Sequence, residues 1–444
     1  MNNLTWKGGS IDGLRSLARH PVAKNTLALY GIQIAGYVIP LLTLPFLARV
    51  LRPDGFGLLL FAQSFAFLAS ITVEYGFTLS AAREVALNRG NKESLAAIAA
   101  GVLGAKLILL SVFMVFAGVA GLTVDSFRQH PIYLVWAIIQ ALAFGLSPFW
   151  YFQGTEQMVG AVLVELFVRA AAAASIFFLV RTPQDGWKAL ASLAIAGCAI
   201  ALLQTIWMYW QIGFSRLRWK ESTRALRIGW KMFLFRGASY IYGAANTFIL
   251  GLFVPSVQVG YFGGAERIFK AIRGLSLPFG QSFYPHMTRL ISADAPKATR
   301  LARWTIPIAG AAGIVFALAL ALFAHPVVLL ILGPNYDASV RVLYVFALIV
   351  PLDAINNALI MHWMLPHGME RAVGAVTAGG IVINVISASV LAPLFAHYGM
   401  AWAILIAEAS QVIALAVIIF RRSLEVRKSD ATAKSQSVAV SRVS

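Results

Sequence analysis

Three cationic side chains recur at short intervals within one apolar segment of the chain. Arg267, Lys270 and Arg273 stand at positions i, i+3 and i+6 of the segment 259–285. On an α-helix this spacing covers about two turns, or roughly 9 Å of rise. Arginine can clamp phosphate oxygens through two hydrogen bonds, and lysine offers a compact positive charge. The pattern predicts a cationic stripe that binds an anionic, phosphate-bearing substrate; the alternative is that these side chains snorkel to the membrane surface.

Three further cations lie in other apolar segments, and we treat them as candidates for the same binding site. They are Lys106, Arg169 and Arg236. A charge inside a membrane is costly, so such a residue faces a cavity or a partner. Glu165 precedes Arg169 by four residues, so an ion pair within one helix is the competing interpretation there. For Lys106 the competing interpretation is snorkelling.

Three acidic residues have no obvious local partner. They are Glu74, Asp353 and Glu408. Each could bind a coupling proton or sodium ion, or pair with a cation of the cavity, and the sequence leaves these alternatives open. No cofactor or metal is expected, because the sequence has no Cys/His pattern of metal ligands. It also has no G-x-x-x-x-G-K-[ST] phosphate loop, so a proton or sodium gradient is a better candidate energy source than ATP.

Membrane-spanning helices must position these side chains. Hydrophobic residues make up 59% of the chain and charged residues 12%, and the mean hydropathy is +0.76. Soluble proteins have about 45–50% apolar and about 25% charged residues. About 20 apolar residues cross the hydrocarbon core. This length predicts an all-α polytopic membrane protein with twelve spans: 27–48, 58–79, 95–117, 132–152, 159–180, 188–212, 230–253, 259–285, 302–324, 341–364, 372–394 and 399–420.

The positive charges predict how the chain is oriented. The net charge of +18 is spread over short loops, which argues against a nucleic-acid partner. If the N-terminus is inside, 24 of the 36 Lys and Arg residues lie in cytoplasmic segments and 6 in outer segments. Cytoplasmic loops carry an excess of Lys and Arg, so both termini are expected in the cytoplasm.

The chain contains a repeat of about 210 residues. W-Y-F-Q-G-T-E-Q-M-V-G-A-V begins at Trp150, and W-M-L-P-H-G-M-E-R-A-V-G-A-V begins at Trp363. A weaker echo relates 53–57 to 255–260. A duplicated helical unit is typical of secondary transporters, which bind their ligand between the copies. We therefore expect two pseudo-symmetric lobes of six helices around a central cavity.

The repeat and the spans predict five regions. The basic loop between spans six and seven is the natural linker between the copies, and the polar, Ser/Lys/Arg-rich end of the chain is expected to be disordered. The regions are an N-terminal cytoplasmic tail (1–24), an N-terminal lobe (25–213), a cytoplasmic linker (214–228), a C-terminal lobe (229–420) and a disordered cytoplasmic tail (421–444).

Three blocks of sequence carry a resemblance to a known family. N-T-L-A-L-Y-G-I-Q-I-A-G-Y-V-I-P-L-L-T-L-P-F-L-A-R-V-L-R-P-D-G-F-G begins at Asn25, E-Y-G-F-T-L-S-A-A-R-E-V-A begins at Glu74, and P-F-W-Y-F-Q-G-T-E-Q-M begins at Pro148. Together they resemble the Wzx-type polysaccharide-biosynthesis flippases of the multidrug/oligosaccharidyl-lipid/polysaccharide exporter superfamily. One departure is Arg52, which stands where such sequences usually have glycine.

The resemblance implies a transporter rather than an enzyme. It implies that the chain moves undecaprenyl-diphosphate-linked glycans from the inner to the outer face of the bacterial inner membrane by alternating access. The product would be O-antigen, capsule or exopolysaccharide, and a polysaccharide polymerase and a chain-length regulator are the implied protein partners.

Three other functions compete with this one. A multidrug exporter of the same superfamily would favour acids over a cationic stripe in its cavity. A lipid II flippase usually has two more spans. A membrane polymerase or ligase would need a sizeable outer loop with paired carboxylates or a base, whereas the longest outer loop here offers only Asp125, Arg128 and His130.

Overall fold

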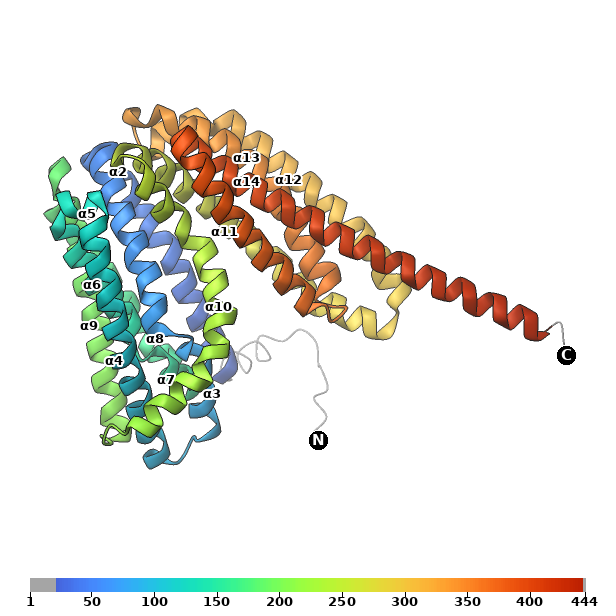
Figure 1. The fold of residues 1–444 in the computed structure, drawn as a ribbon, viewed down its shortest axis with the longest axis horizontal. Helices are drawn as coiled ribbons and strands as arrows, with labels where there is room; N and C mark the ends of the chain where they lie inside the picture. Colours follow the sequence, from blue (N-terminus) through green and yellow to red (C-terminus); the bar gives the residue numbers. More distant parts are fainter. Residues whose placement is uncertain (1–20, 442–444) are drawn as a thin grey trace, which may run out of the picture. The chain divides into compact units, whose positions relative to one another are not determined.

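A computed structural model describes the backbone of residues 21–441 (Figure 1). It describes the side chains of residues 41–422, except 231, 234–244, 275–282 and 295. Residues 1–20 of the predicted N-terminal tail lie outside the described residues. The side chain of Arg236 is also outside them.

The described chain is helical, with short turns between helices and no strand. The long apolar segments explain this, since a backbone in hydrocarbon must satisfy its own hydrogen bonds. The elements are α2 (Pro21–Glu74), α3 (Phe77–Leu87), α4 (Lys92–Thr123), α5 (Asp125–Gln129), α6 (Pro131–Leu146), α7 (Phe149–Gly154), α8 (Met158–Leu179), η1 (Pro183–Asp185), α9 (Gly186–Ile212), α10 (Trp219–Phe253), α11 (Ser256–Ala293), α12 (Ala295–Ile331), η2 (Pro334–Tyr336), α13 (Asp337–Ala358), η3 (Leu359–Met364) and α14 (Glu370–Ser441).

Eight segments of the described residues are long and apolar enough to cross a membrane. Two of them, Leu41–Leu87 and Glu370–Arg422, are longer than one crossing requires. The long helix α2 in the first is kinked at Arg52 (φ 58°), and α14 in the second is kinked at Ala396 (φ 57°). These kinks fall where the sequence predicts a turn between two spans. The count of twelve spans stays a prediction.

The described contacts divide the chain into two compact units. Unit 1 comprises 1–260 and 331–335, and unit 2 comprises 261–330 and 336–444. Within unit 1, α2 packs against α6, α8, α9 and α10, and α10 packs against α4. Gly101 and Gly104 of α4 permit this last approach, because a Cβ on either would meet Glu221 or Ser222 of α10. The two predicted lobes stay a prediction. In the structure α10, which contains the predicted seventh span, packs against the N-terminal helices α2 and α4.

Helices extend into the predicted linker and into the tail that is predicted to be disordered. α10 begins at Trp219, inside the predicted linker 214–228. α14 continues to Ser441, through residues that composition assigns to a disordered tail. No Gly or Pro interrupts residues 400–441, so nothing in the backbone chemistry stops the helix there.

The two repeated tryptophans are both buried, and each lies in a helix of six residues. Trp150 is in α7, which follows a break at Ser147 and Pro148, and it belongs to a core cluster of unit 1. Trp363 is in η3, a π-helical turn, and it belongs to a core cluster of unit 2. The repeated motif thus ends a long helix in both halves of the sequence.

The weaker echo has a direct structural counterpart. The segments 53–57 and 255–260, which the sequence relates to each other, lie in contact within unit 1. The hydroxyl of Ser256 donates a hydrogen bond to the carboxylate of Asp54. The start of α11 is therefore fixed to the kink in α2.

Candidate functional site

Unit 2 contains a cavity of about 490 Å³ between α11, α12, α13 and η3. Most of its wall is apolar, including the rings of Phe269, Phe283 and Phe316. Five residues place polar groups in this wall: Arg273, Thr305, Asp353, Asn357 and His362. A mostly apolar cavity with a few convergent polar groups is the usual form of a ligand site.

Arg273 lies between two carboxylates at this cavity. Its guanidinium is 2.5 Å from Oδ1 of Asp353 and 4.0 Å from Oε1 of Glu408. The side chain of Glu408 is only 2% exposed, and that of Asp353 is 14% exposed. Glu408 also accepts a hydrogen bond of 3.3 Å from the side-chain amide of Asn356. Three helices, α11, α13 and α14, therefore supply one network of charged and polar groups.

A charged ligand that entered this cavity would compete with the groups of the network. An anionic phosphate would compete with the two carboxylates for the guanidinium of Arg273. Once released, Asp353 and Glu408 would repel each other in a poorly hydrated place, which favours uptake of a proton or a cation. Two of the three predicted coupling residues, Asp353 and Glu408, are thus brought together with one predicted phosphate-binding residue, Arg273. Glu74 lies in unit 1, and all these roles stay predictions.

The other two members of the predicted stripe do not line this cavity, and their role toward substrate stays a prediction. Lys270 pairs with Glu266 one turn earlier, at 3.0 Å, and its side chain is 44% exposed. Arg267 is partly buried, and neither of these two cations lines the cavity that Arg273 lines. The reason is helical geometry: successive residues turn by about 100°, so positions i and i+6 are separated by roughly 120° around the axis.

Lys106 is buried in unit 1, at 3% exposure. Its ammonium donates a hydrogen bond of 3.1 Å to the backbone oxygen of Ser147, where α6 ends. The hydroxyl of Ser147 in turn donates to Gln204, whose amide donates to the backbone oxygen of Ala161. Within the described residues no carboxylate lies in ion-pair distance of Lys106. It is far too buried to snorkel, and its predicted role toward substrate stays a prediction.

Two other predicted site residues have local partners. Arg169 pairs with Glu165 at 2.6 Å, which confirms the predicted ion pair within one helix. Glu74 accepts hydrogen bonds from the backbone nitrogens of Gly76 (2.9 Å) and Thr78 (2.8 Å). Its carboxylate therefore satisfies amides at the start of α3, a structural role that the sequence reasoning missed.

His362 and Thr305 are further polar groups of the cavity that the sequence reasoning did not select. Nδ1 of His362 lies 3.1 Å from the hydroxyl of Thr305, and the ring packs against Phe283. The signal was available, because His362 directly precedes the repeated Trp363 in an apolar segment.

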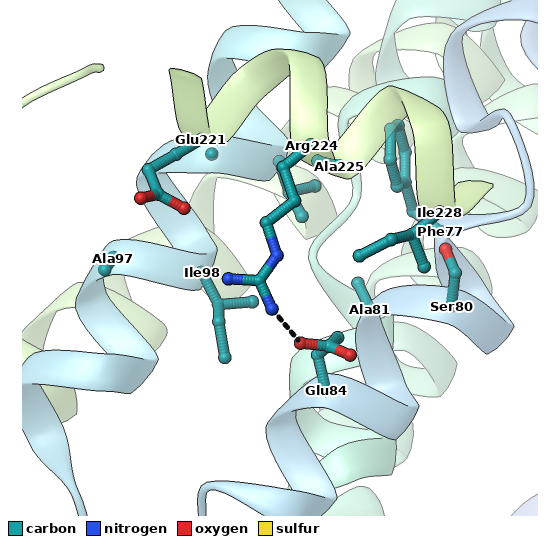
Figure 2. A pocket seen from close by; sticks show the side chains of 12 residues that line it. Phe77, Ser80, Ala81, Glu84, Ala97, Ile98, Glu221, Arg224, Ala225 and Ile228 are labelled. Atoms are coloured by element: carbon teal, nitrogen blue, oxygen red, sulfur yellow. Dashed lines mark ion pairs between the residues drawn. The ribbon is translucent and has the colours of Figure 1, made fainter. Parts of the chain in front are cut away.

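A second, much smaller cavity lies in unit 1 and is shown in Figure 2. Its volume is about 60 Å³, and α3, α4 and α10 form its walls. Arg224 reaches across it to Glu84, with 3.6 Å between the charged groups. This space holds a few water molecules at most. It is an ion-pair contact between helices rather than a substrate site.

The fold is shared with known membrane transporters. A structure of the "Lipid II flippase MurJ" in an inward closed conformation superposes with a TM-score of 0.67 at 13% identity, over 89% of this chain and 87% of that one. An inward-facing multidrug resistance MATE family transporter of the MOP superfamily gives 0.62 at 15% identity, over 89% and 98%. The chain is therefore an all-α, multi-pass membrane protein with a transporter fold, as the sequence predicts.

Sequence comparison places the chain within that class. Residues 22–291 match the polysaccharide biosynthesis protein family, and the chain belongs to this family. A protein of Escherichia coli (strain K12) named "Putative O-antigen transporter" is 28% identical over 390 residues, covering 87% of this chain and 93% of its own. A Shigella dysenteriae protein of the same name is 25% identical over 393 residues, covering 87% and 96%.

Proposed function

We propose that this protein is a flippase for undecaprenyl-diphosphate-linked oligosaccharides. It moves them from the cytoplasmic to the periplasmic face of the bacterial inner membrane, with both of its own termini in the cytoplasm, for assembly into a surface polysaccharide. Membership of the polysaccharide biosynthesis family, together with two relatives named as O-antigen transporters over most of their length, is the observation that supports this most strongly.

The network around Arg273 supports a mechanism with ion coupling. In the conformation described here, Arg273 is paired with Asp353 and lies near Glu408. A diphosphate that binds Arg273 would displace these acids, and a proton or sodium ion would then neutralise them. Release of the lipid on the outer side would restore the ion pair. Substrate and ion would therefore bind the same network in turn, which couples transport to a gradient.

A multidrug exporter is the second candidate function. Two buried carboxylates at a largely apolar cavity would also suit an organic cation. Arg273 favours an anionic substrate, because it neutralises part of this negative charge and offers a guanidinium that phosphate oxygens can bind. For the flippase, we propose a polysaccharide polymerase and a chain-length regulator as protein partners.

Deletion of the gene tests both candidates in one strain. A flippase mutant should lose surface polysaccharide while its susceptibility to cationic drugs stays unchanged, and the wild-type chain should restore the polysaccharide. Normal surface polysaccharide together with increased drug susceptibility would instead support the multidrug exporter.

A further inference from the structure

Two hollows in unit 1 share lining residues and form one groove. Figure 1 shows the end of the unit at which α3 and α7 lie, where the lining segments meet. The volumes of the two hollows are about 410 Å³ and about 510 Å³, and both are lined by Lys92 and Ile212. Three segments that the sequence places in the cytoplasm build the walls: the turn before α4, the turn after α7, and the end of α9 with the loop that follows it.

Cations line one part of this groove. Lys92, Arg216 and Arg218 are exposed, and the described structure gives their side chains no ion-pair partner. Two acids, Glu93 and Glu221, lie in the same wall, so the cations outnumber the acids. Free guanidinium and ammonium groups around a hollow are suited to phosphate oxygens.

Arg89 differs from these three cations because it is already engaged. Its guanidinium donates to Oε1 of Glu156 at 2.8 Å and to the backbone oxygen of Gly154 at 2.6 Å. The hydrogen bond and the charge of Arg89 hold the pKa of Glu156 below its usual value, so the carboxylate stays ionised at neutral pH. The pair fixes the turn after α7 and contributes no net charge to the groove.

The other part of the groove has the composition of a sugar site. The indole of Trp210 is 85% exposed and lies beside Gln211. The hydroxyl of Tyr151 donates to Gln211 at 2.8 Å, and Gln211 donates to Gln157 at 2.8 Å. This chain of hydrogen bonds holds the two side-chain amides in place. Fixed amides bind hydroxyls, and an exposed indole offers an apolar face to a sugar ring.

Three residues of the first copy of the repeated motif line this groove, and none of them lines the cavity in unit 2. Tyr151, Thr155 and Gln157 all come from W-Y-F-Q-G-T-E-Q, and all three line the groove. We propose that the groove binds the phosphorylated sugar head group of a membrane lipid on the cytoplasmic face, before translocation begins. This inference rests on the proposed function for the identity of the lipid.

Phosphate-bearing head groups reach this face from two sources, the lipid-linked glycan and the bulk anionic phospholipid. Purified full-length protein in detergent would be titrated with undecaprenyl diphosphate and, separately, with phosphatidylglycerol, and bound lipid would be counted by native mass spectrometry. The test variant is the double substitution Arg216→Ala plus Arg218→Ala. The matched control is Lys220→Ala plus Arg227→Ala, which removes two exposed charges from the same region but from no cavity wall.

The groove variant should bind undecaprenyl diphosphate on the order of tenfold more weakly than the control variant. Its binding of phosphatidylglycerol should match that of the control. Equal binding of undecaprenyl diphosphate by the two variants would overturn the proposal and leave the groove as a solvated loop region. Equal weakening toward both lipids would also overturn it and identify a site for bulk anionic lipid.

A second pair of variants tests the sugar part. Lipid-linked oligosaccharide extracted from the deletion strain would replace undecaprenyl diphosphate as the probe. Trp210→Ala should lose most of the preference for the sugar-bearing lipid, whereas Trp219→Ala should keep it, since Trp219 is also exposed (72%) but lines neither hollow. The same preference in both variants would contradict a sugar-binding role.

These outcomes are separable from failure of the proposed function. If deletion leaves surface polysaccharide intact, the proposed function fails, although the binding difference between groove and control variants can still be measured. If the wild-type chain restores polysaccharide and the two double variants bind alike, only the groove proposal fails.

Discussion

Gly57 and Gly260 meet backbone to backbone within unit 1. A Cβ on Gly57 would stand 2.6 Å from the backbone nitrogen of Gly260 and would collide with the carbonyl oxygen of Ser256. A Cβ on Gly260 would in turn collide with the carbonyl oxygen of Pro53. The two glycines occupy corresponding places in the weak internal echo of the sequence, so the repeat positions two copies of one turn against each other.

Gly57→Ala should destabilise the described conformation. The added methyl has backbone atoms on its far side, which cannot rotate away as a side chain could, and overpacking of this kind costs about 1–3 kcal/mol. Thermal unfolding of the purified protein measures the change. Gly118→Ala is the control, because a Cβ at Gly118 in α4 meets nothing within 4 Å. Equal stability of the two variants would mean that the contact between the turns is not maintained in solution.

Arg273→Ala should leave two acids of low exposure without their shared cation and abolish export of polysaccharide. Contacts of this kind couple by about 0.5–3 kcal/mol. A double-mutant cycle with Asp353→Ala, followed by chemical unfolding, measures this coupling. Lys270→Ala serves as control, because its exposed pair with Glu266 contributes less than about 1 kcal/mol. Additive effects of Arg273→Ala and Asp353→Ala would show that the two residues do not interact.

Lys106→Met should leave the stability unchanged or raise it. Methionine keeps the length of the side chain and removes the cost of burying an ammonium, which offsets the loss of its hydrogen bond to the backbone oxygen of Ser147. The sequence predicts that Lys106 contacts substrate. In that case Lys106→Met reduces polysaccharide export while the free energy of unfolding stays the same. Normal export together with normal stability would remove Lys106 from the substrate site.

Asp353→Asn should weaken the dependence of transport on a gradient. The amide keeps the size of the side chain but can neither take up a proton nor hold a sodium ion by charge. Flipping of a lipid-linked glycan in proteoliposomes, with and without an imposed proton or sodium gradient, measures this dependence. A response to the gradient equal to that of the wild type would place the coupling residue elsewhere.

The parts of the site that could be predicted are those set by local spacing. Glu165 and Arg169 are four residues apart on one helix, so their ion pair follows from the sequence alone. The division of the stripe was also accessible, since i and i+6 diverge around a helix. Sequence spacing says where a cation lies on its own helix.

The network around Arg273 could not be derived in this way. It joins residues of α11, α13 and α14, which meet only through the packing of unit 2. The role of Glu74 was hidden for another reason: it depends on Tyr75 (φ 50°) and Gly76 (φ 77°), whose left-handed backbone turns the amides toward the carboxylate. The all-α membrane fold was predictable because apolar segments of this length leave few alternatives.

The most direct test of the account is the fate of lipid-linked glycans when the gene is deleted. Lipids would be extracted from deletion and complemented strains, identified by mass spectrometry, and assigned to a membrane face by their accessibility in sealed vesicles of known orientation. The account predicts that an undecaprenyl-diphosphate oligosaccharide accumulates on the cytoplasmic face and disappears when the wild-type chain is restored. Absence of this intermediate, or its accumulation on the periplasmic face, would contradict the assignment of this protein as the flippase.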